Sequence, residues 1–390
     1  SSGASSGSTS ASSKLVFDAF FCDSADESSF FQLFELGLQE HWLISPEDLL
    51  LLPKDVLGAG GFGFVVSGLF HSAKVVVKIP KTSLQVTPHP NFADMANELR
   101  VLRRCRHPNL VHFYGVILDP LQKCFAVVLE FVESLSLDLI MSRPNTTLTI
   151  SSRYDLILCS CRALYYLHSQ VPPIVHGDVK SNNVLVERQG GSLKAKLADF
   201  GLSRILTHNP RLLGGTLAWM APEVLRNAKP QPSSDTFSFG RLVFFIATGI
   251  KPFHGMSKQA IKDTLSSCVL PPLNWPRVCP IEEHCKACVA DCLQAQESAR
   301  PSIAELHNQI EAWPIDSAWC TPRGATTWSD GVRELHRMVC QRAKTLATID
   351  EETPPAAWSS WISSPSRSKR LSVPSLEPTP LSTNIQIIAL

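Results

Sequence analysis

A short polar segment near the middle of the chain is followed by a second motif that also contains an aspartate. Residues 176–183 read His-Gly-Asp-Val-Lys-Ser-Asn-Asn, and residues 199–201 read Asp-Phe-Gly. A hydroxyl nucleophile needs a carboxylate to accept its proton, and a departing phosphate needs Mg²⁺ held by another carboxylate and an amide oxygen. Asp178, Asp199 and Asn183 meet these three needs. The two motifs together therefore predict phosphoryl-transfer chemistry.

These motifs resemble those of the eukaryotic protein kinases, whose catalytic loop reads H-R-D-x-K-x-x-N and whose metal motif is D-F-G. Ala-Pro-Glu at residues 221–223 falls where that family closes its activation segment. The resemblance covers residues 49–313 and implies a two-lobed α+β fold. It places a small antiparallel β-sheet lobe over 49–132 and a larger helical lobe over 133–313. It also implies that ATP binds in the cleft between the lobes together with Mg²⁺ or Mn²⁺.

Closely spaced glycines upstream predict a phosphate-binding loop. Residues 58–65 follow the pattern G-x-G-x-F-G-x-V, in which missing Cβ atoms let the backbone approach phosphates. Apolar residues on both sides predict the two strands of a hairpin. In the next strand Val76 and Lys78 point the same way, so Lys78 can reach the phosphates while Val76 covers the adenine. The family usually has alanine at the position of Val76. The predicted nucleotide contacts here are Gly58, Gly60, Gly61, Gly63, Val65, Val76 and Lys78.

Apolar residues on one side of residues 92–104 predict a helix, and Glu98 is the acid well inside it. The resemblance implies that Glu98 pairs with Lys78 and fixes the direction of the lysine. The alternative is that Glu98 is an ordinary solvated acid on a helix surface.

An unbroken apolar run at residues 125–129 predicts a buried strand that leads to the crossing between the lobes. By resemblance, Leu129 is the gatekeeper at the back of the adenine pocket, and the backbones of Glu130 and Val132 bond the adenine edge. Leu185 then forms the floor under the adenine.

The second half of the predicted kinase region contains patterns that predict secondary structure and contacts that stabilise the fold. Residues 154–168 have the periodicity of a buried helix, and residues 184–197 predict a small hairpin after the catalytic loop. By resemblance, Arg300 pairs with Glu223 of the Ala-Pro-Glu motif, and Asp235 holds the backbone of the catalytic loop.

Lys180 and the pair Gly215-Thr216 resemble serine/threonine kinases of the tyrosine-kinase-like group, which includes Raf-like and mixed-lineage members. The implied activity is transfer of the ATP γ-phosphoryl group to Ser and Thr hydroxyls of protein substrates in intracellular signalling. The implied catalytic residues are Asp178, Lys180, Asn183, Lys78 and Glu98, with Asn183 and Asp199 as the Mg²⁺ ligands. The alternative is a pseudokinase or scaffold that binds nucleotide or partners without catalysis.

Gly177 is the main departure within the catalytic loop, because most of the family has arginine there. That arginine pairs with a phosphate on the activation segment and orders the segment. A chain with glycine has no guanidinium to receive the phosphate. We therefore expect activation not to depend on phosphorylation of residues 199–223, whose hydroxyls are those of Ser203, Thr207 and Thr216.

Charge and hydropathy limit the partners that this chain can attract. The formal net charge is +1 and the pI is about 7.6, so no overall field favours nucleic acid or an acidic membrane. The apolar runs are far shorter than the roughly 20 residues that a membrane-spanning helix needs. We expect protein substrates, ATP and regulatory partners that bind the flanking regions, and no membrane segment. The chain begins with Ser rather than Met, which fits a longer parent protein.

The twelve cysteines leave two interpretations. His284, Cys285, Cys288 and Cys292 are close enough in sequence to ligate a metal. They also lie in a run of Ala, Val and Leu that is typical of a helix, and buried thiols on that helix are the interpretation we favour. Reduced cysteines indicate a cytoplasmic protein.

The flanking regions differ in composition from the predicted kinase region. Residues 1–25 are Ser-rich and predicted to be disordered, and residues 26–48 are predicted to form a short helical lead-in, with helical spacing over 30–43. Residues 314–390 are predicted to be a mostly disordered Ser/Pro-rich tail with a helix near 330–347. That helix either packs on the preceding domain or binds a partner.

Overall fold

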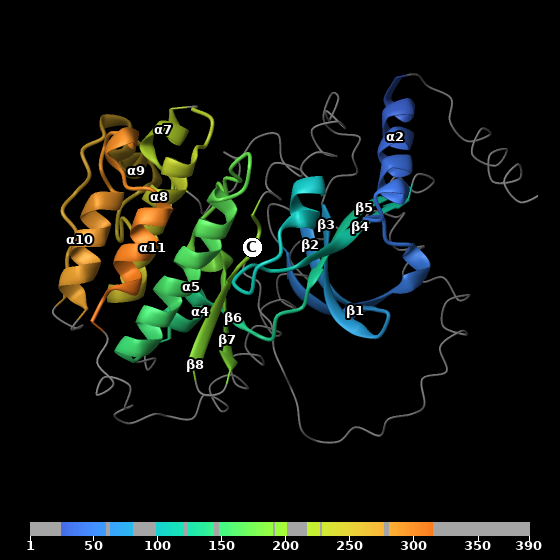
Figure 1. The fold of residues 1–390 in the computed structure, drawn as a ribbon, viewed down its shortest axis with the longest axis horizontal. Helices are drawn as coiled ribbons and strands as arrows, with labels where there is room; N and C mark the ends of the chain where they lie inside the picture. Colours follow the sequence, from blue (N-terminus) through green and yellow to red (C-terminus); the bar gives the residue numbers. More distant parts are fainter. Residues whose placement is uncertain are drawn as a thin grey trace, which may run out of the picture.

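The chain folds into two lobes that differ in secondary structure. The computed structural model describes residues 25–59, 63–80, 99–119, 124–143, 148–189, 192–200, 217–226, 228–276 and 281–314. Figure 1 shows a β-sheet with helix α2 at one end of the molecule and the helices α5 to α11 at the other. The predicted two-lobed α+β fold is confirmed.

The smaller lobe is built on a five-stranded antiparallel sheet with the strand order β1-β2-β3-β5-β4. Apolar residues occupy successive positions in its middle strands, at residues 75–77 and 125–129, because both faces of the sheet are buried there. Val76 packs on one face, whereas Val75 and Val77 pack on the other. The strands are β1 (Leu49–Ala59), β2 (Gly63–Phe70), β3 (Ala73–Pro80), β4 (Phe113–Asp119) and β5 (Cys124–Glu130).

The lead-in helix α2 spans Ala25–Gln39, so the helix predicted over 30–43 begins and ends earlier than expected. Residues 42–44 instead run beside β4: the Val116 N–H donates to the Trp42 carbonyl at 3.0 Å, and the Ile44 N–H donates to the Val116 carbonyl at 2.8 Å. Gly115 permits this approach, because a Cβ there would lie 2.4 Å from the Trp42 carbonyl oxygen. A short 3₁₀ turn, η1 (Pro46–Asp48), then leads into β1.

The larger lobe is organised around helix α8 (Pro232–Thr248), which is buried from Ser234 to Ala247. A helix that is apolar on most sides belongs in the interior, and here α5 and α10 pack against it. The other helices are α4 (Leu137–Met141), α5 (Ile150–His168), α7 (Pro222–Leu225), α9 (Lys258–Ser267), α10 (Glu282–Cys292) and α11 (Ile303–Glu311), with the 3₁₀ turns η2 (Ser181–Asn183) and η4 (Glu297–Ala299).

A second, three-stranded sheet lies beside α5. Its strands are β6 (Leu135–Ser136), β7 (Val184–Gln189) and β8 (Ser192–Leu197). β7 and β8 pair antiparallel in continuous register, which confirms the hairpin predicted after the catalytic loop.

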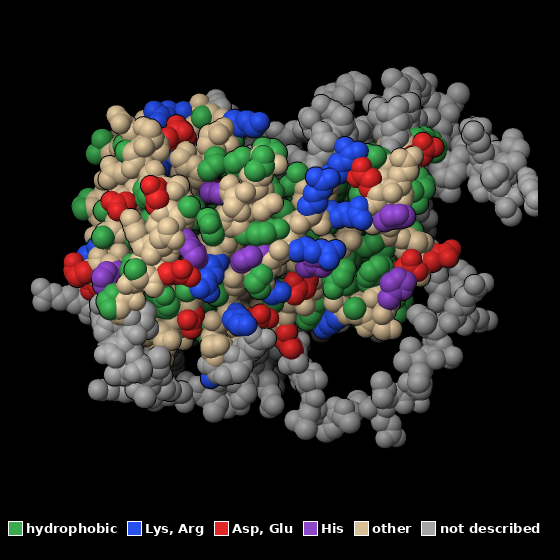
Figure 2. Space-filling view, in the orientation of Figure 1, with side chains coloured by type: hydrophobic (Ala, Val, Ile, Leu, Met, Phe, Trp, Pro, Cys, Tyr) green, Lys and Arg blue, Asp and Glu red, His purple; other side chains and the backbone are tan. Residues whose placement is uncertain are grey.

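The described surface agrees with the small net charge. On the face drawn in Figure 2, acidic and basic side chains both occur over each lobe. None of the helices in the described ranges combines the length and the apolar character that crossing a bilayer would require.

The contact between α8 and α10 gives a prediction about stability. A Cβ on Gly240 would lie 2.4 Å from the Cβ of Cys292, which is closer than two carbons can approach. Although helix propensity alone favours alanine by about 1 kcal/mol, we expect Gly240→Ala to lower the free energy of unfolding by about 1–3 kcal/mol. Chemical denaturation measures this difference. The control Ser266→Ala, on the exposed face of α9, should stay within about 0.5 kcal/mol of the parent chain, and a stabilising Gly240→Ala would contradict the packing described here.

Candidate active site

The segment 176–183 is held in place by Asp235, which lies in the first turn of α8 and is 1% exposed. One carboxylate oxygen accepts the Gly177 N–H at 2.8 Å, and the other accepts the His176 N–H at 2.7 Å. The Nε2 of His168, at the end of α5, lies 2.9 Å from the second oxygen. Hydrogen bonds to a buried carboxylate are charge-assisted, so they hold the backbone of the loop firmly. This geometry confirms the contact implied for Asp235.

Gly177 turns the backbone beside Asp178, the predicted base. Its φ is +79°, in the left-handed region that glycine adopts without steric strain. A Cβ on Gly177 would meet no atom within 4 Å. Glycine adopts this backbone conformation without strain, and the surroundings would leave space for a side chain.

Asp178, Lys180 and Asn183 form one hydrogen-bonded group. The Lys180 ammonium lies 2.6 Å from Oδ2 of Asp178. The Nδ2 of Asn183 donates to the same oxygen at 3.0 Å and to the Asp178 backbone carbonyl at 2.8 Å. Both side chains restrict the rotation of the Asp178 carboxylate. The structure thus brings these three predicted residues together.

Lys78 on β3 reaches across from the smaller lobe to Asp199, which follows β8. Its ammonium lies 2.5 Å from Oδ1 of Asp199 and is almost completely buried. Burial by itself raises the pKa of Asp199, but the Lys78 ammonium outweighs it and holds that pKa below its usual value. Asp199 has a φ of +66°, and the next residue, Phe200, is buried with its ring centroid 6.5 Å from that of His176. The sequence predicted Glu98 as the partner of Lys78, and Glu98 lies outside the described residues.

The donor set fits a magnesium site. Asn183 directs its amide nitrogen at Asp178, which leaves the amide oxygen as the atom that can bind a metal. Asp199 remains ionised because its pKa is lowered. Carboxylate and amide oxygens are the ligands that Mg²⁺ prefers. No group of three or more His, Cys, Asp or Glu side chains in the described ranges is arranged to hold a metal.

The residues predicted to contact the adenine lie in the core between the lobes. Val76 pairs with Leu129 across β3 and β5, and Val65 pairs with Lys78 across β2 and β3. The N–H of Glu130 donates to the His112 carbonyl at 2.8 Å, so Glu130 can offer a nucleotide only its carbonyl oxygen. Val65, Val76, Leu129, Val132 and Leu185 are all buried in one cluster.

Gly58 and Gly63 lie in β1 and β2, where they pair with Val65 and Pro80. Several predictions fall outside the described residues: Gly60 and Gly61, the activation-segment residues Ser203, Thr207, Gly215 and Thr216, and the tail with its predicted helix near 330–347.

The Ala-Pro-Glu motif is fixed by a buried ion pair. The guanidinium of Arg300 binds Glu223 through two parallel contacts, at 2.7 and 2.9 Å. The hydroxyl of Ser234, one residue before Asp235, also donates to Glu223 at 3.0 Å. This confirms the pairing of Arg300 with Glu223, and it ties the motif to the same turn of α8 that holds the catalytic loop.

The cysteines of α10 form part of the core. Cys285, Cys288 and Cys292 recur at helical spacing on the buried side of the helix, whereas His284 is exposed and stacks on Trp313 with the ring centroids 5.8 Å apart. The imidazole therefore points away from the thiols. The interpretation of buried thiols on a helix is confirmed.

His168 is the residue that the sequence analysis missed. It shares no motif with Asp235, from which it is separated by 67 positions. The only available signal was a polar residue at the end of an otherwise buried helix, and that signal is common at helix ends.

The sequence of this chain is similar to those of known protein kinases. The model of the family described as "Protein kinase domain" matches residues 52–310. The chain is 33% identical to the probable serine/threonine-protein kinase SIS8 of Arabidopsis thaliana over 64% of the chain and 24% of that protein. It is 30% identical to the serine/threonine-protein kinase CTR1 of the same plant, over 65% of the chain and 30% of the relative.

A human relative, mitogen-activated protein kinase kinase kinase 10, is 28% identical over 66% of the chain and 27% of its own length. The chain therefore spans less than a third of the length of these three relatives.

The Glu223–Arg300 pair gives a prediction about acid stability. Burial raises the pKa of Glu223, but the hydrogen bond and charge of Arg300, a backbone hydrogen bond and the hydroxyl of Ser234 together outweigh burial, so this pKa lies below its usual value. Glu223→Gln leaves Arg300 buried without a counter-charge, so we expect a loss of about 3–5 kcal/mol in the free energy of unfolding at pH 7.

Because the folded-state pKa is depressed, the stabilisation by Glu223 is complete above the unfolded-state pKa and is lost as the pH falls through the folded-state pKa. Denaturant titrations from pH 7 to pH 3 should show the two proteins converging at the acidic end. The control Glu297→Gln, at an exposed position, should change little. A gap between parent and Glu223→Gln that stays constant down to pH 3 would contradict the assignment.

Proposed function

The chain belongs to the protein kinase family, and we propose that it is a serine/threonine kinase of the tyrosine-kinase-like group. It transfers the γ-phosphoryl group of ATP to Ser and Thr hydroxyls of protein substrates, and residues 49–313 form its kinase domain. The observations that carry this proposal are the hydrogen-bonded group of Asp178, Lys180 and Asn183 and the Lys78–Asp199 ion pair. The names of the relatives, which are serine/threonine kinases, support the same activity.

Asp178 acts as the base that orients the substrate hydroxyl and accepts its proton. Its Oδ2 is engaged by Lys180 and Asn183, so the carboxylate has a fixed direction. Such a positioned base accelerates a reaction by roughly 10²–10⁴. Lys180, at 2.6 Å from this carboxylate, is close enough to neutralise charge on the phosphoryl group as it is transferred.

The nucleotide lies between the lobes. Val76 and Leu185 enclose the adenine, with Leu129 behind it, and the carbonyl of Glu130 and the backbone of Val132 bond its edge. Lys78 binds the phosphates under the glycine loop. Asn183 and Asp199 would hold Mg²⁺, or Mn²⁺ in its place, and the ion would supply positive charge to the phosphates.

The alternative of a pseudokinase is disfavoured by the same contacts. Asp178, Asn183 and Lys78 keep both their identities and mutual positions suited to catalysis. The departures at Val76 and Gly177 remove no group that reacts or binds metal. We propose a cytoplasmic enzyme whose regulatory partners bind the regions outside the kinase domain.

The first functional prediction concerns the base. Replacing Asp178 with Asn keeps the size of the side chain but removes the proton acceptor, so phosphate transfer from radiolabelled ATP to a generic protein substrate should fall by about 10²–10⁴. Asp263→Asn, an exposed change of the same kind on α9, serves as the control and should leave the rate unchanged. Equal labelling by Asp178→Asn and the parent enzyme would reject the catalytic assignment.

The second functional prediction concerns the acceptor. Lys180 and Gly215-Thr216 favour the serine/threonine class, so hydrolysis of the labelled substrate should release phosphoserine and phosphothreonine. Two-dimensional phosphoamino-acid analysis separates these from phosphotyrosine. Predominant phosphotyrosine would reject the assignment to the serine/threonine class, whereas the conclusion that the chain has a kinase fold would stand.

The third functional prediction concerns the metal. Because the donors are hard oxygens, EDTA should abolish phosphate transfer and added Mg²⁺ should restore it. Metal analysis of the purified protein tests whether the cysteines of α10 bind zinc. Stoichiometric zinc that disappears in Cys285→Ser would show that the interpretation of α10 as a helix with buried thiols is wrong.

A further inference from the structure

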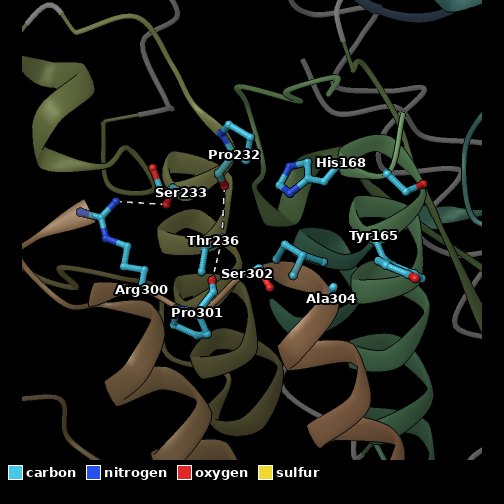
Figure 3. Close-up of a pocket in the computed structure, with 11 residues that line it drawn as sticks. Tyr165, His168, Pro232, Ser233, Thr236, Arg300, Pro301, Ser302 and Ala304 are labelled. Carbon is cyan, nitrogen blue, oxygen red and sulfur yellow. Dashed lines mark hydrogen bonds between the residues drawn. The ribbon is translucent and has the colours of Figure 1, made fainter. Parts of the chain in front are cut away.

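Two buried arginines contact the ring of Phe237, but within the described ranges only Arg300 has an acidic partner. The guanidinium carbon of Arg300 lies 5.0 Å from the ring centroid, and that of Arg241 lies 5.4 Å from it. Figure 3 shows Arg300 at the wall of a cavity in the helical lobe, where its guanidinium donates to the Ser233 carbonyl at 3.0 Å. Two nitrogens of Arg300 also bind Glu223, so this charge is balanced by a carboxylate.

The guanidinium of Arg241 is buried without a counter-charge. Arg241 lies near the middle of α8 and is 1% exposed. In the part of the chain that the structure describes, no carboxylate pairs with it, and its Nε and Nη2 have no hydrogen-bond partner. Burial lowers the pKa of Arg241 to about 10, so the side chain stays charged at neutral pH. Because a buried charge without a partner is strongly destabilising, an anion at this position would be bound favourably.

The two nitrogens without partners determine which anion fits. Nε and Nη2 lie on the same edge of the planar guanidinium, so their N–H groups point in parallel directions. Such an edge binds two oxygens of one carboxylate or phosphate group, and the two hydrogen bonds are charge-assisted. A monatomic anion cannot fill both positions in this way. The geometry therefore favours a small oxyanion.

Aromatic rings cover the guanidinium of Arg241. The ring centroid of Phe253 lies 4.2 Å from its Cζ, and Phe253 is itself buried. Cation–π attraction to Phe253 and Phe237 offsets part of the cost of burial, but it supplies no acceptor for the Nε and Nη2 hydrogens. Both rings belong to an apolar cluster that also contains Ile261 and Leu265 of α9. This cluster is a poor environment for an unpaired charge.

Phe253 lies in a strained connection between α8 and α9. Its φ is +56°, in the left-handed region that is unfavourable for a residue with a bulky side chain. The next two residues, His254 and Gly255, are exposed. A movement of Phe253 away from Arg241 would relieve the backbone strain and would bring solvent to the unpaired edge of the guanidinium.

We propose that Arg241 is a binding site for a small oxyanion, a carboxylate or phosphate group, and that Phe253 gates this site. When the ring of Phe253 covers the guanidinium, the site is closed. When the ring moves aside, Nε and Nη2 donate to two oxygens of the ligand. None of the residues assigned to nucleotide, metal or proton transfer belongs to the apolar cluster around Phe253, so the two sites share no side chain.

Binding is tested by phosphorus NMR titration of the full chain with inorganic phosphate, which requires no catalysis and is independent of the proposed function. Arg241→Met removes the charge but keeps an unbranched side chain that suits a core, so saturable phosphate binding should weaken by at least about tenfold. The matched change Arg226→Met, at an exposed position, should bind phosphate as the parent does. Absence of saturable binding by the parent, or equal binding by both variants, would overturn the proposal.

Two comparisons distinguish this site from others that attract anions. Lys78→Met is measured in parallel because Lys78 can also bind phosphate, and loss of binding in Lys78→Met but not in Arg241→Met would reject the proposal. Acetate, which has two oxygens on one carbon, should compete with phosphate and would show that a carboxylate is accepted. Chloride at the same ionic strength should not compete, and competition by chloride equal to that by acetate would reject a bidentate site.

The gate is tested by Phe253→Gly, which removes the ring and the strain of the positive φ. Phosphate should then bind at least about fivefold more tightly, because the closed state no longer competes with the ligand. His254→Gly, at the exposed neighbouring position, should bind phosphate as the parent does. If the affinity of Phe253→Gly equals that of the parent, Phe253 is not the gate.

Amide hydrogen exchange of the parent chain tests the gate without a substitution. Since phosphate binds the open state, peptides that contain residues 250–256 should exchange at least about threefold faster at saturating phosphate. Peptides from β4 should exchange at an unchanged rate. Unchanged or slower exchange of residues 250–256 in the phosphate-saturated protein would show that binding does not open this connection.

Discussion

The buried carboxylate of Asp235 joins helix α8 to the end of α5 and to the loop that follows α5. An ionised group in the interior is tolerated only when donors surround it, and here two backbone N–H groups and one imidazole do so. The donors come from the end of α5 and from the loop after it. Satisfying this one side chain therefore fixes the backbone at His176 and Gly177, and with it the position of Asp178.

Helix α8 carries both of the buried acceptor networks that shape the site. Asp235 holds the catalytic loop, and the preceding Ser234 joins the Glu223–Arg300 pair that holds the Ala-Pro-Glu motif. About one turn further on, Ser238 donates to the Trp219 carbonyl at 2.8 Å. The helix can perform these functions because its remaining surface is packed, including the close contact at Gly240. The same helix therefore fixes the positions of both the loop and the Ala-Pro-Glu motif.

The sequence predicted the parts of the site that depend on local spacing. Asp178, Lys180 and Asn183 are separated by a few residues, so the loop that contains them largely determines their mutual position. Contacts between distant elements were harder to predict, as with His168 and Asp235, because no periodicity links the end of one helix to the start of another. The course of residues 42–44 along β4 depends on the missing side chain of Gly115, which the apolar spacing of residues 30–43 does not reveal.

The reactivity of the buried thiols can report local opening of the core. Burial raises the pKa of Cys105 to about 11, and it also raises the pKa of Cys161 on α5 and of Cys292 on α10. Since the thiolate is the form that reacts with alkylating and disulfide reagents, these side chains are unreactive while the core around them stays packed. The thiol of Cys161 lies 3.9 Å from the Ile303 carbonyl of α11, and Cys292 packs on Gly240 of α8. The rate at which a thiol reagent modifies Cys161 therefore reports how often α5 separates from α11, and the rate at Cys292 reports how often α10 separates from α8.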